Sequence, residues 1–166
     1  ERVREMEFDI AYYSPLSRAL DTAYLVLGMA KPMGNDGTNY PLSFYPNDQI
    51  VFNIPLLIEH RIAERSFGDL LGVVKEGYTK DQRFVKYAGR DVTKSFHDKA
   101  DGGESFRDLE VRLTSFFEEL EQKHWGKRIL VFSHNGPIRV MRKYFENLSE
   151  KETLKLSNPH CQLICY

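Results

Sequence analysis

Arg18 is a candidate anion-binding residue because of its place in the sequence. An apolar and aromatic run over residues 9–13 predicts a buried strand, and a helix is predicted from Ser14 to about Leu27. Ser14 followed by Pro15 is typical of a helix N-cap and first helical position. Arg18 then lies one turn into the helix, where its guanidinium can reach an anion near free backbone N–H groups. The alternative is that Arg18 lies over the helix surface and binds no ligand.

His134 is a second candidate because it lies between a predicted strand over residues 129–132 and a predicted helix over residues 137–145. Ligands of parallel sheets gather beyond the carboxyl ends of the strands, which is where His134 falls. Gly136 lets the backbone approach a ligand closely. A purely structural histidine is the alternative. The remaining histidines have no comparable setting and are interpreted as surface or structural: His60, His97, His124 and His160.

Glu64 is a third candidate and lies in a loop that contains Phe67, Gly68 and Gly72. Partial burial favours the protonated form of a carboxyl group, which would suit Glu64 to donate a proton. The alternative is a solvated charge. Further along the chain, Ser105 and Asp108 resemble a helix-capping box with aspartate in place of glutamate.

The elements that would position these residues alternate between strands and helices. The helix with the clearest apolar stripe covers residues 105–123. Additional strands are predicted at residues 56–58 and 162–166, and additional helices at residues 80–88 and 149–156. This alternation predicts an α/β fold, a three-layer α/β/α sandwich with a mostly parallel central sheet. Residues 30–55, rich in proline, glycine and asparagine, are interpreted as an exposed excursion and a candidate substrate rim.

The bulk properties fit one domain over residues 1–166. The net charge is −1 with acidic and basic residues interspersed, so neither a nucleic-acid partner nor a membrane partner is indicated. No stretch approaches the roughly 20 apolar residues of a membrane span. Cys161 and Cys165 are interpreted as small core residues of a strand in a reducing compartment, which predicts a cytoplasmic protein. A metal site that includes His160 is the minor alternative.

Four strings in this order resemble the histidine phosphatase superfamily, the phosphoglycerate-mutase-like group. They are Ser-Pro-Leu-x-Arg-Ala-x-x-Thr-Ala at residues 14–23, Glu-Arg-x-Phe-Gly-x-Leu-x-Gly at residues 64–72, Gly-Glu-Ser at residues 103–105, and Ser-His at residues 133–134. The resemblance extends from Phe8 to Tyr166.

The resemblance implies a histidine that attacks phosphorus and is transiently phosphorylated. It implies that Arg18 and His134 bind the phosphate, that Asn135 can reach it, and that Glu64 protonates the leaving oxygen. The substrate implied is a small phosphorylated molecule, and no metal or organic cofactor is implied. Asn135 occupies a position that is often glycine in the family.

The nucleophile of this family belongs to an Arg-His-Gly string at the end of a first, central strand. No such string occurs among the 166 residues. We therefore expect that an N-terminal portion carrying this strand precedes Glu1, since its loss would expose the edges of the neighbouring strands. If no such portion exists, the domain is a non-catalytic phosphate-binding module.

A phosphatase is favoured over a mutase within the resemblance. Mutases of the family tend to carry Asn-Lys after the second string, where this chain has Val73, Val74 and Lys75, and a proline-rich basic insert that residues 94–101 lack. Many family phosphatases have Trp-Glu-Gly where this chain has Leu70-Leu71-Gly72, so the leaving-group side differs. An unrelated nucleotide-binding α/β domain is disfavoured because no Gly-rich phosphate loop of the usual spacing is present.

Overall fold

The computed structural model describes residue 3 and residues 6–28, 54–73, 84–87, 92, 94–160 and 162–166. The backbone contacts form two compact units, each described here by itself. The sheet unit comprises Glu1–Ala63, His124–His134 and Leu163–Cys165, and the helical unit comprises Glu64–Lys123, Asn135–Gln162 and Tyr166. The single domain over residues 1–166 stays a prediction.

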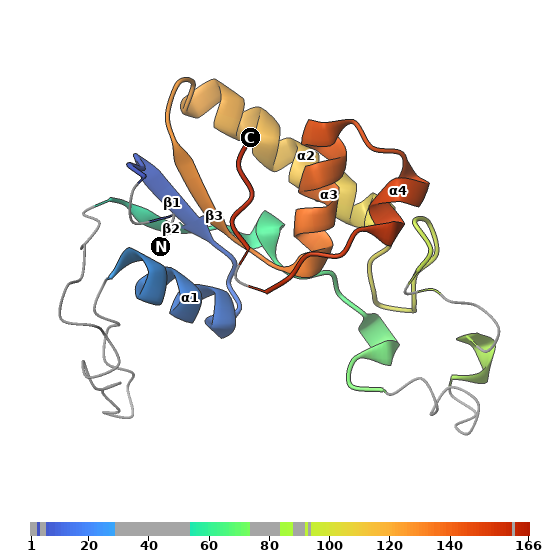
Figure 1. Cartoon of the computed structure of the whole chain (residues 1–166). Helices are drawn as coiled ribbons and strands as arrows, with labels where there is room; N and C mark the ends of the chain where they lie inside the picture. The colour runs from blue at the N-terminus through green and yellow to red at the C-terminus, as the bar shows by residue number, and fades with distance from the viewer. Residues whose placement is uncertain are drawn as a thin grey trace, which may run out of the picture. The chain divides into compact units, whose positions relative to one another are not determined.

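The sheet unit is built on three parallel strands, β1 (Ile10–Tyr13), β2 (Leu56–Ile58) and β3 (Ile129–Phe132). Their order is β2-β1-β3, so β1 lies between two strands that come later in the chain (Figure 1). The parallel strands alternate along the chain with helices, which confirms the predicted α/β class. Each strand ends at the same edge of the sheet, so the residues that follow β1 and β3 are brought close to each other.

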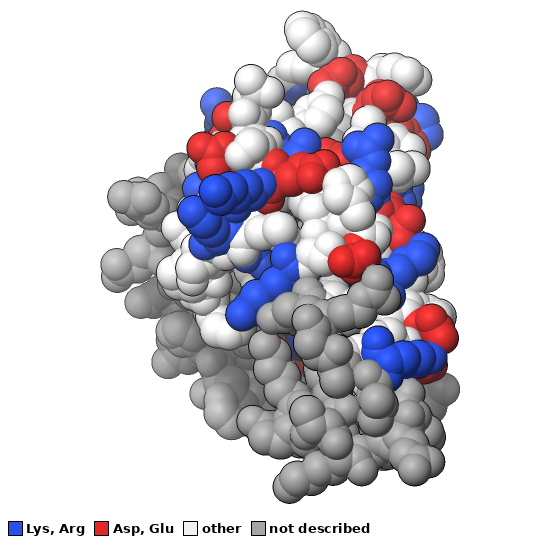
Figure 2. All heavy atoms as spheres, turned by 90° about the vertical axis from the view of Figure 1, so that its right-hand side faces the viewer, with Lys and Arg blue, Asp and Glu red and all other residues white. Residues whose placement is uncertain are grey.

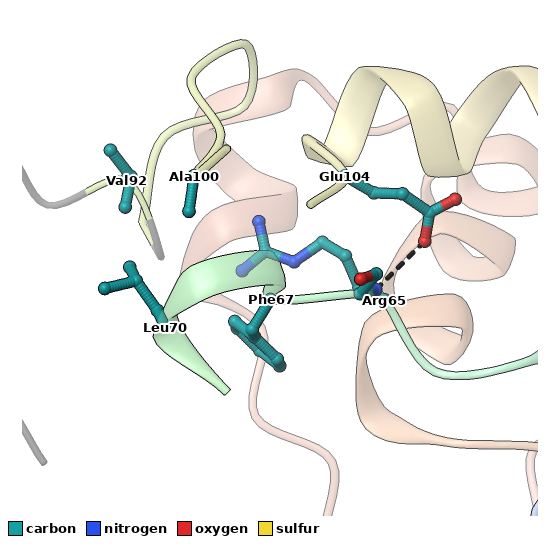
Figure 3. Close-up of a pocket in the computed structure, with 7 residues that line it drawn as sticks. Arg65, Phe67, Leu70, Val92, Ala100 and Glu104 are labelled. Carbon is teal, nitrogen blue, oxygen red and sulfur yellow. Dashed lines mark hydrogen bonds between the residues drawn. The ribbon is translucent and has the colours of Figure 1, made fainter. Parts of the chain in front are cut away.

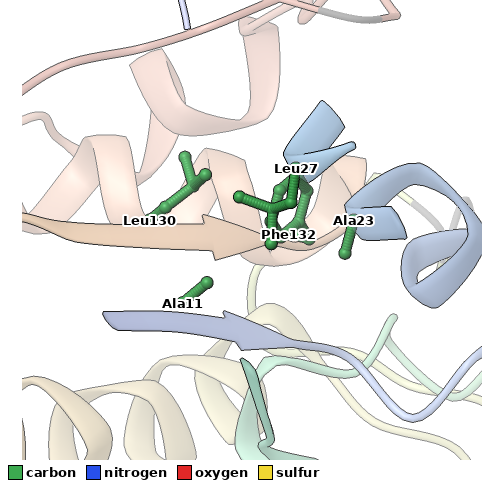
Figure 4. Close-up of a cluster of buried hydrophobic side chains, with 5 residues drawn as sticks. All are labelled: Ala11, Ala23, Leu27, Leu130 and Phe132. Carbon is green, nitrogen blue, oxygen red and sulfur yellow. The ribbon is translucent and has the colours of Figure 1, made fainter. Parts of the chain in front are cut away.

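Helix α1 (Ser17–Leu27) covers the sheet with a small apolar face. Its Ala23 and Leu27 are fully buried and pack in one cluster with Ala11 of β1 and with Leu130 and Phe132 of β3 (Figure 4). The helix ends as predicted at a glycine in the left-handed conformation, Gly28, with φ of 66°.

The predicted start of α1 is wrong. The N-cap residue is Leu16, in extended conformation, and neither Ser14 nor Pro15 belongs to the helix. Ser14 instead continues the pairing of β1 with β3, because its N–H donates to the carbonyl of Phe132 at 3.0 Å. The serine side chain is therefore available for a contact other than capping.

The helical unit contains α2 (Phe106–Lys123), α3 (Asn135–Glu146) and α4 (Glu150–Lys155). Helix α2 buries the stripe predicted from its spacing, and α3 packs against both α2 and α4. The capping box of α2 is confirmed, since Ser105 and Asp108 each accept a backbone N–H of the other at 3.0 Å. The charged side chains of this unit pair with one another, as Lys99 does with Asp108 at 2.7 Å, and basic and acidic groups interleave on the face in Figure 2.

The strand predicted at the C-terminus and its buried cysteines are not observed, and two other predicted segments are described only in part. Residues 162–166 are not a strand; none of the three strands pairs with them, and an unpaired strand lacks its backbone hydrogen bonds. Cys165 is exposed and does not contribute to a core, whereas Cys161 lies outside the described residues.

Of the predicted helix over residues 80–88, the described part forms a 3-10 turn at Val85–Tyr87. The predicted excursion at residues 30–55 lies outside the described residues except for Ile54 and Pro55.

None of the described helices is both long enough and apolar enough to cross a membrane.

Candidate active site

The carboxyl ends of β1 and β3 bring Ser14 and His134 together in the sheet unit. The register pairs Tyr13 with Phe132, so the chain leaves both strands side by side. Nε2 of His134 lies 2.7 Å from Oγ of Ser14, at hydrogen-bond distance. Ser14 is fully buried and His134 is 8% exposed. The histidine is thus held at the sheet edge where ligands of α/β proteins bind, as predicted from its place after the strand.

Arg18 lies close enough to His134 to affect its charge. Burial, and to a smaller extent the positive charge of Arg18, lower the pKa of His134 from 6.5 to about 4. The imidazole is therefore neutral at physiological pH. Arg18 itself is exposed on the first turn of α1. A neutral N–H donor next to an exposed guanidinium is an arrangement suited to an oxyanion.

Glu64 lies in the helical unit, where two backbone N–H groups hold its carboxylate. Oε1 accepts from Arg65 N–H at 2.9 Å and from Gly136 N–H at 3.2 Å. Gly136 is buried in the first turn of α3, and a Cβ at this position would overlap Oε1 of Glu64. A side chain at position 136 would therefore displace the Glu64 carboxylate from its present place.

The loop that carries Glu64 is fixed by the Gly-Glu-Ser string. Ser66 N–H donates to Oε2 of Glu104 at 3.0 Å, and Glu104 N–H donates back to the Ser66 carbonyl at 2.9 Å. Arg112 donates from Nε to Oε1 of Glu104 at 2.8 Å. Burial opposes ionisation of Glu104, but the hydrogen bonds from Arg112 and Ser66 lower the pKa of its carboxyl. The second and third strings therefore serve in part to position one loop.

Arg65 is a buried cation that the sequence analysis did not single out. It is 5% exposed, and its guanidinium lies 4.3 Å from the ring centroid of Phe106 and 4.8 Å from that of Phe67. Burial lowers the pKa of Arg65, while the neighbouring Glu64 opposes this shift. The sequence shows only that Arg65 follows Glu64 and lies two residues before Phe67. Neighbours in the sequence do not indicate whether a side chain is buried, so the burial of Arg65 could not be predicted from them.

Arg139 is a second arginine near Glu64 that the sequence analysis missed. Burial lowers its pKa and the charge of Glu64 opposes the shift. Its guanidinium lies 5.4 Å from the Phe106 ring centroid and donates from one terminal nitrogen to the carbonyl of Leu154. Its buried Nε has no hydrogen-bond partner among the described residues. Two guanidiniums thus share one aromatic ring beside the candidate acid.

A small, partly open hollow lies next to this arginine cluster (Figure 3). Arg65, Phe67 and Glu104 contribute to its lining, together with Ser66, Leu70, Val92 and Ala100. None of the predicted site residues lines it. The hollow is a packing feature of the loop around Arg65.

Asn135 is the fourth predicted site residue and begins α3. It is exposed, and its side-chain carbonyl accepts from the amide of Asn158 at 3.0 Å. Its predicted contact with phosphate stays a prediction. Among the described residues there is no group of three or more histidine, cysteine, aspartate or glutamate side chains that could hold a metal ion.

The structure therefore brings Ser14 and His134 together, with Arg18 near enough for its charge to lower the pKa of His134, and separately places Glu64 against Gly136. These features define an α/β protein with a buried, hydrogen-bonded histidine at the carboxyl edge of its parallel sheet. The sequence profile of the histidine phosphatase superfamily (branch 1) matches residues 49–166, and the chain belongs to this superfamily.

Similar proteins include both mutases and phosphatases. A 2,3-bisphosphoglycerate-dependent phosphoglycerate mutase of Methanococcus vannielii is 28% identical over 95% of this chain and 69% of its own length. The mutase of Azorhizobium caulinodans is 30% identical over 90% of this chain and 64% of its own length. A solved mycobacterial glucosyl-3-phosphoglycerate phosphatase has a TM-score of 0.60 at 21% identity, over 89% of this chain and 63% of that chain. This chain thus spans about two thirds of the length of these relatives.

Proposed function

We propose that the intact protein hydrolyses a small phosphate monoester through a phosphohistidine intermediate. The observation that carries the proposal is the neutral, buried His134 at the carboxyl ends of two parallel strands, where it is hydrogen-bonded to Ser14 and its pKa is lowered in part by the charge of Arg18. This combination binds an oxyanion without requiring a metal ion. The free cysteine Cys165 is compatible with the reducing conditions of a cytoplasmic protein, which we propose as its location.

Each residue has a distinct role in the proposed reaction. Arg18 and His134 stabilise the negative charge of the equatorial phosphoryl oxygens, and Asn135 adds a polar contact. A histidine of an Arg-His-Gly string attacks phosphorus while Glu64 gives its proton to the leaving oxygen. Water then attacks the phosphohistidine, Glu64 takes the proton of that water, and inorganic phosphate leaves. Both steps conserve protons and electrons and need no cofactor.

A mutase is the second candidate because relatives at 28% and 30% identity are named as phosphoglycerate mutases. The two reactions share the phosphohistidine and differ in the acceptor, which is water in a phosphatase and a hydroxyl of the bound substrate in a mutase. We favour the phosphatase because Val73, Val74 and Lys75 replace the Asn-Lys pair that mutases of this family tend to carry.

The test uses the intact protein, with whatever sequence precedes Glu1. Release of inorganic phosphate from p-nitrophenyl phosphate, together with an acid-labile phosphohistidine trapped on the protein, is the expected result. Isomerisation of 3-phosphoglycerate with little net phosphate release would instead support the mutase. If no Arg-His-Gly string precedes Glu1 and no phosphohistidine forms, the domain is a non-catalytic phosphate-binding module and the proposal is wrong.

A further inference from the structure

Ser14 is a buried polar residue to which the proposed reaction gives no role. Its backbone is held at the end of β1 by the hydrogen bond from its N–H to the Phe132 carbonyl. Its side chain is then directed to Nε2 of His134, a residue 120 positions later in the chain. The 2.7 Å distance is typical of a hydrogen bond with a hydroxyl donor. A serine in this place was expected to cap α1, and it does not.

The direction of the hydrogen bond follows from the partners of the serine hydroxyl. A hydroxyl has one proton to donate, and a buried donor left without an acceptor costs about 1 to 3 kcal/mol. Leu16 N–H already donates weakly to Oγ of Ser14 at 3.4 Å, which occupies one lone pair. Among the residues that the structure describes, Nε2 of His134 is the acceptor available for the serine proton.

We propose that Ser14 is a positioning residue that donates its O–H to Nε2 of His134 and fixes the imidazole in the Nδ1–H tautomer. Nδ1 makes no hydrogen bond to any described residue, so its N–H can donate to an oxygen of the bound phosphoryl group. The identity of that ligand rests on the proposed function, whereas the tautomer rests on the serine contact alone.

The opposite arrangement is less favourable on two grounds. If His134 carried its proton on Nε2 and donated to Ser14, the serine proton would lose its acceptor in a fully buried position. Nδ1 would then present a lone pair to an oxyanion, and two lone pairs repel. If the Nδ1–H group of His134 is already oriented before the ligand binds, the ring does not have to reorient when charge develops on the phosphoryl oxygens. Burial and Arg18, which lower the pKa of His134 to about 4, keep the ring in the neutral form in which tautomers differ.

The tautomer can be measured directly in the intact protein without any substrate. In nitrogen-15 and proton correlation spectra of histidine-labelled protein near pH 7, the His134 ring is assigned by its loss in His134→Gln. We expect the Nδ1–H pattern in the wild type and a shift toward Nε2–H in Ser14→Ala. Ser17→Ala is the matched control, since Ser17 is exposed at the start of α1, and it should leave the spectrum unchanged. An Nε2–H pattern in the wild type, or an unchanged Nδ1–H pattern in Ser14→Ala, would overturn the proposal.

Kinetics separate this proposal from the proposed function. In an active enzyme, Ser14→Ala should lower kcat/KM for p-nitrophenyl phosphate by about tenfold, the scale of one lost hydrogen bond, while Ser17→Ala does not. If the wild type shows the Nδ1–H tautomer but hydrolyses no monoester, the proposed function is wrong, whereas the proposal that Ser14 fixes the tautomer of His134 remains supported. If hydrolysis is found and Ser14→Ala leaves both the tautomer and kcat/KM unchanged, the proposed function stands and Ser14 has no positioning role.

Discussion

The carboxylate of Glu64 accepts the backbone N–H of Gly136 at 3.2 Å, across 72 positions of the sequence. A side chain at position 136 would occupy the place of Oε1. The backbone that carries His134 into α3 therefore also holds the candidate acid, because Gly136 follows His134 by two residues. The activities expected below for variants of these residues are those of the intact protein.

Gly136→Ala should impair activity without unfolding the protein. The added methyl group meets the far end of the Glu64 side chain, which can rotate away, so the fold is kept while the carboxylate loses its position. We expect a loss of about tenfold or more in kcat, the scale for misplacing an acid by a small distance. Circular dichroism melting checks the fold. Unchanged kcat for an alkyl phosphate would mean that the place of Glu64 does not matter for the reaction.

Glu64→Gln should impair the hydrolysis of alkyl phosphates more than that of p-nitrophenyl phosphate. An alkoxide leaving group needs a proton, and general acid catalysis contributes about 100-fold or more, whereas p-nitrophenolate leaves without one. The ratio of kcat/KM values for the two substrates is the measurement. Equal losses on both substrates would remove Glu64 from the acid role.

Arg18→Ala and His134→Ala should each lower phosphatase activity by at least ~100-fold, the scale for one lost stabiliser of transition-state charge. Arg128→Ala is a suitable control, since Arg128 is an exposed arginine of the same unit that pairs loosely with Glu7 at 3.9 Å. Activity within a few-fold of wild type in either site variant would contradict the assignment.

His134 should make the protein less stable in acid. Its pKa is about 4 in the fold and 6.5 when unperturbed, so as pH falls the unfolded chain takes up a proton that the folded chain excludes. The stability that neutral His134 contributes is present above pH 6.5 and is lost as pH falls through this window toward 4. Urea unfolding of wild type and His134→Gln without phosphate is the measurement, and their difference in unfolding free energy should change across that window. A pH-independent difference would show that His134 titrates normally.

Arg65→Ala should destabilise the protein by about 2 kcal/mol, because a desolvated guanidinium then leaves the faces of Phe67 and Phe106. The matched control is Arg107→Ala, in which an exposed arginine loses its pair with Glu110 and stability changes by about 0.5 kcal/mol or less. Chemical unfolding of both variants provides the comparison. Equal stability of the two variants would indicate that the aromatic contacts of Arg65 contribute little.

Local patterns in the sequence predicted the elements well. Strands β1, β2 and β3 were placed within one residue of their observed bounds, since short apolar runs between turn residues have few other structures available to them. Helix α2 was predicted from its apolar spacing and its Ser105–Asp108 cap, both of which are local properties. The position of His134 after a buried strand was predicted correctly, and it places the residue at the carboxyl edge of the sheet.

Predictions that depended on distant partners failed or were not made. The strand predicted at residues 162–166 is absent. A strand is stabilised by pairing with neighbouring strands, and the local sequence does not indicate whether such strands lie beside it. Arg65 and Arg139 were missed because their burial depends on Phe106, which lies far from both in the sequence.

The sequence by itself determined the family, the parallel α/β class and the candidate residues for binding and protonating a phosphate. Only the tertiary structure decided how two of them are held: Ser14 contacts His134 where a helix cap was predicted, and Glu64 rests on Gly136. Both contacts join positions more than 70 residues apart. A side chain with several possible hydrogen-bond partners takes the one that the folded backbone brings within about 3 Å, and the spacing of residues along the chain does not specify that partner.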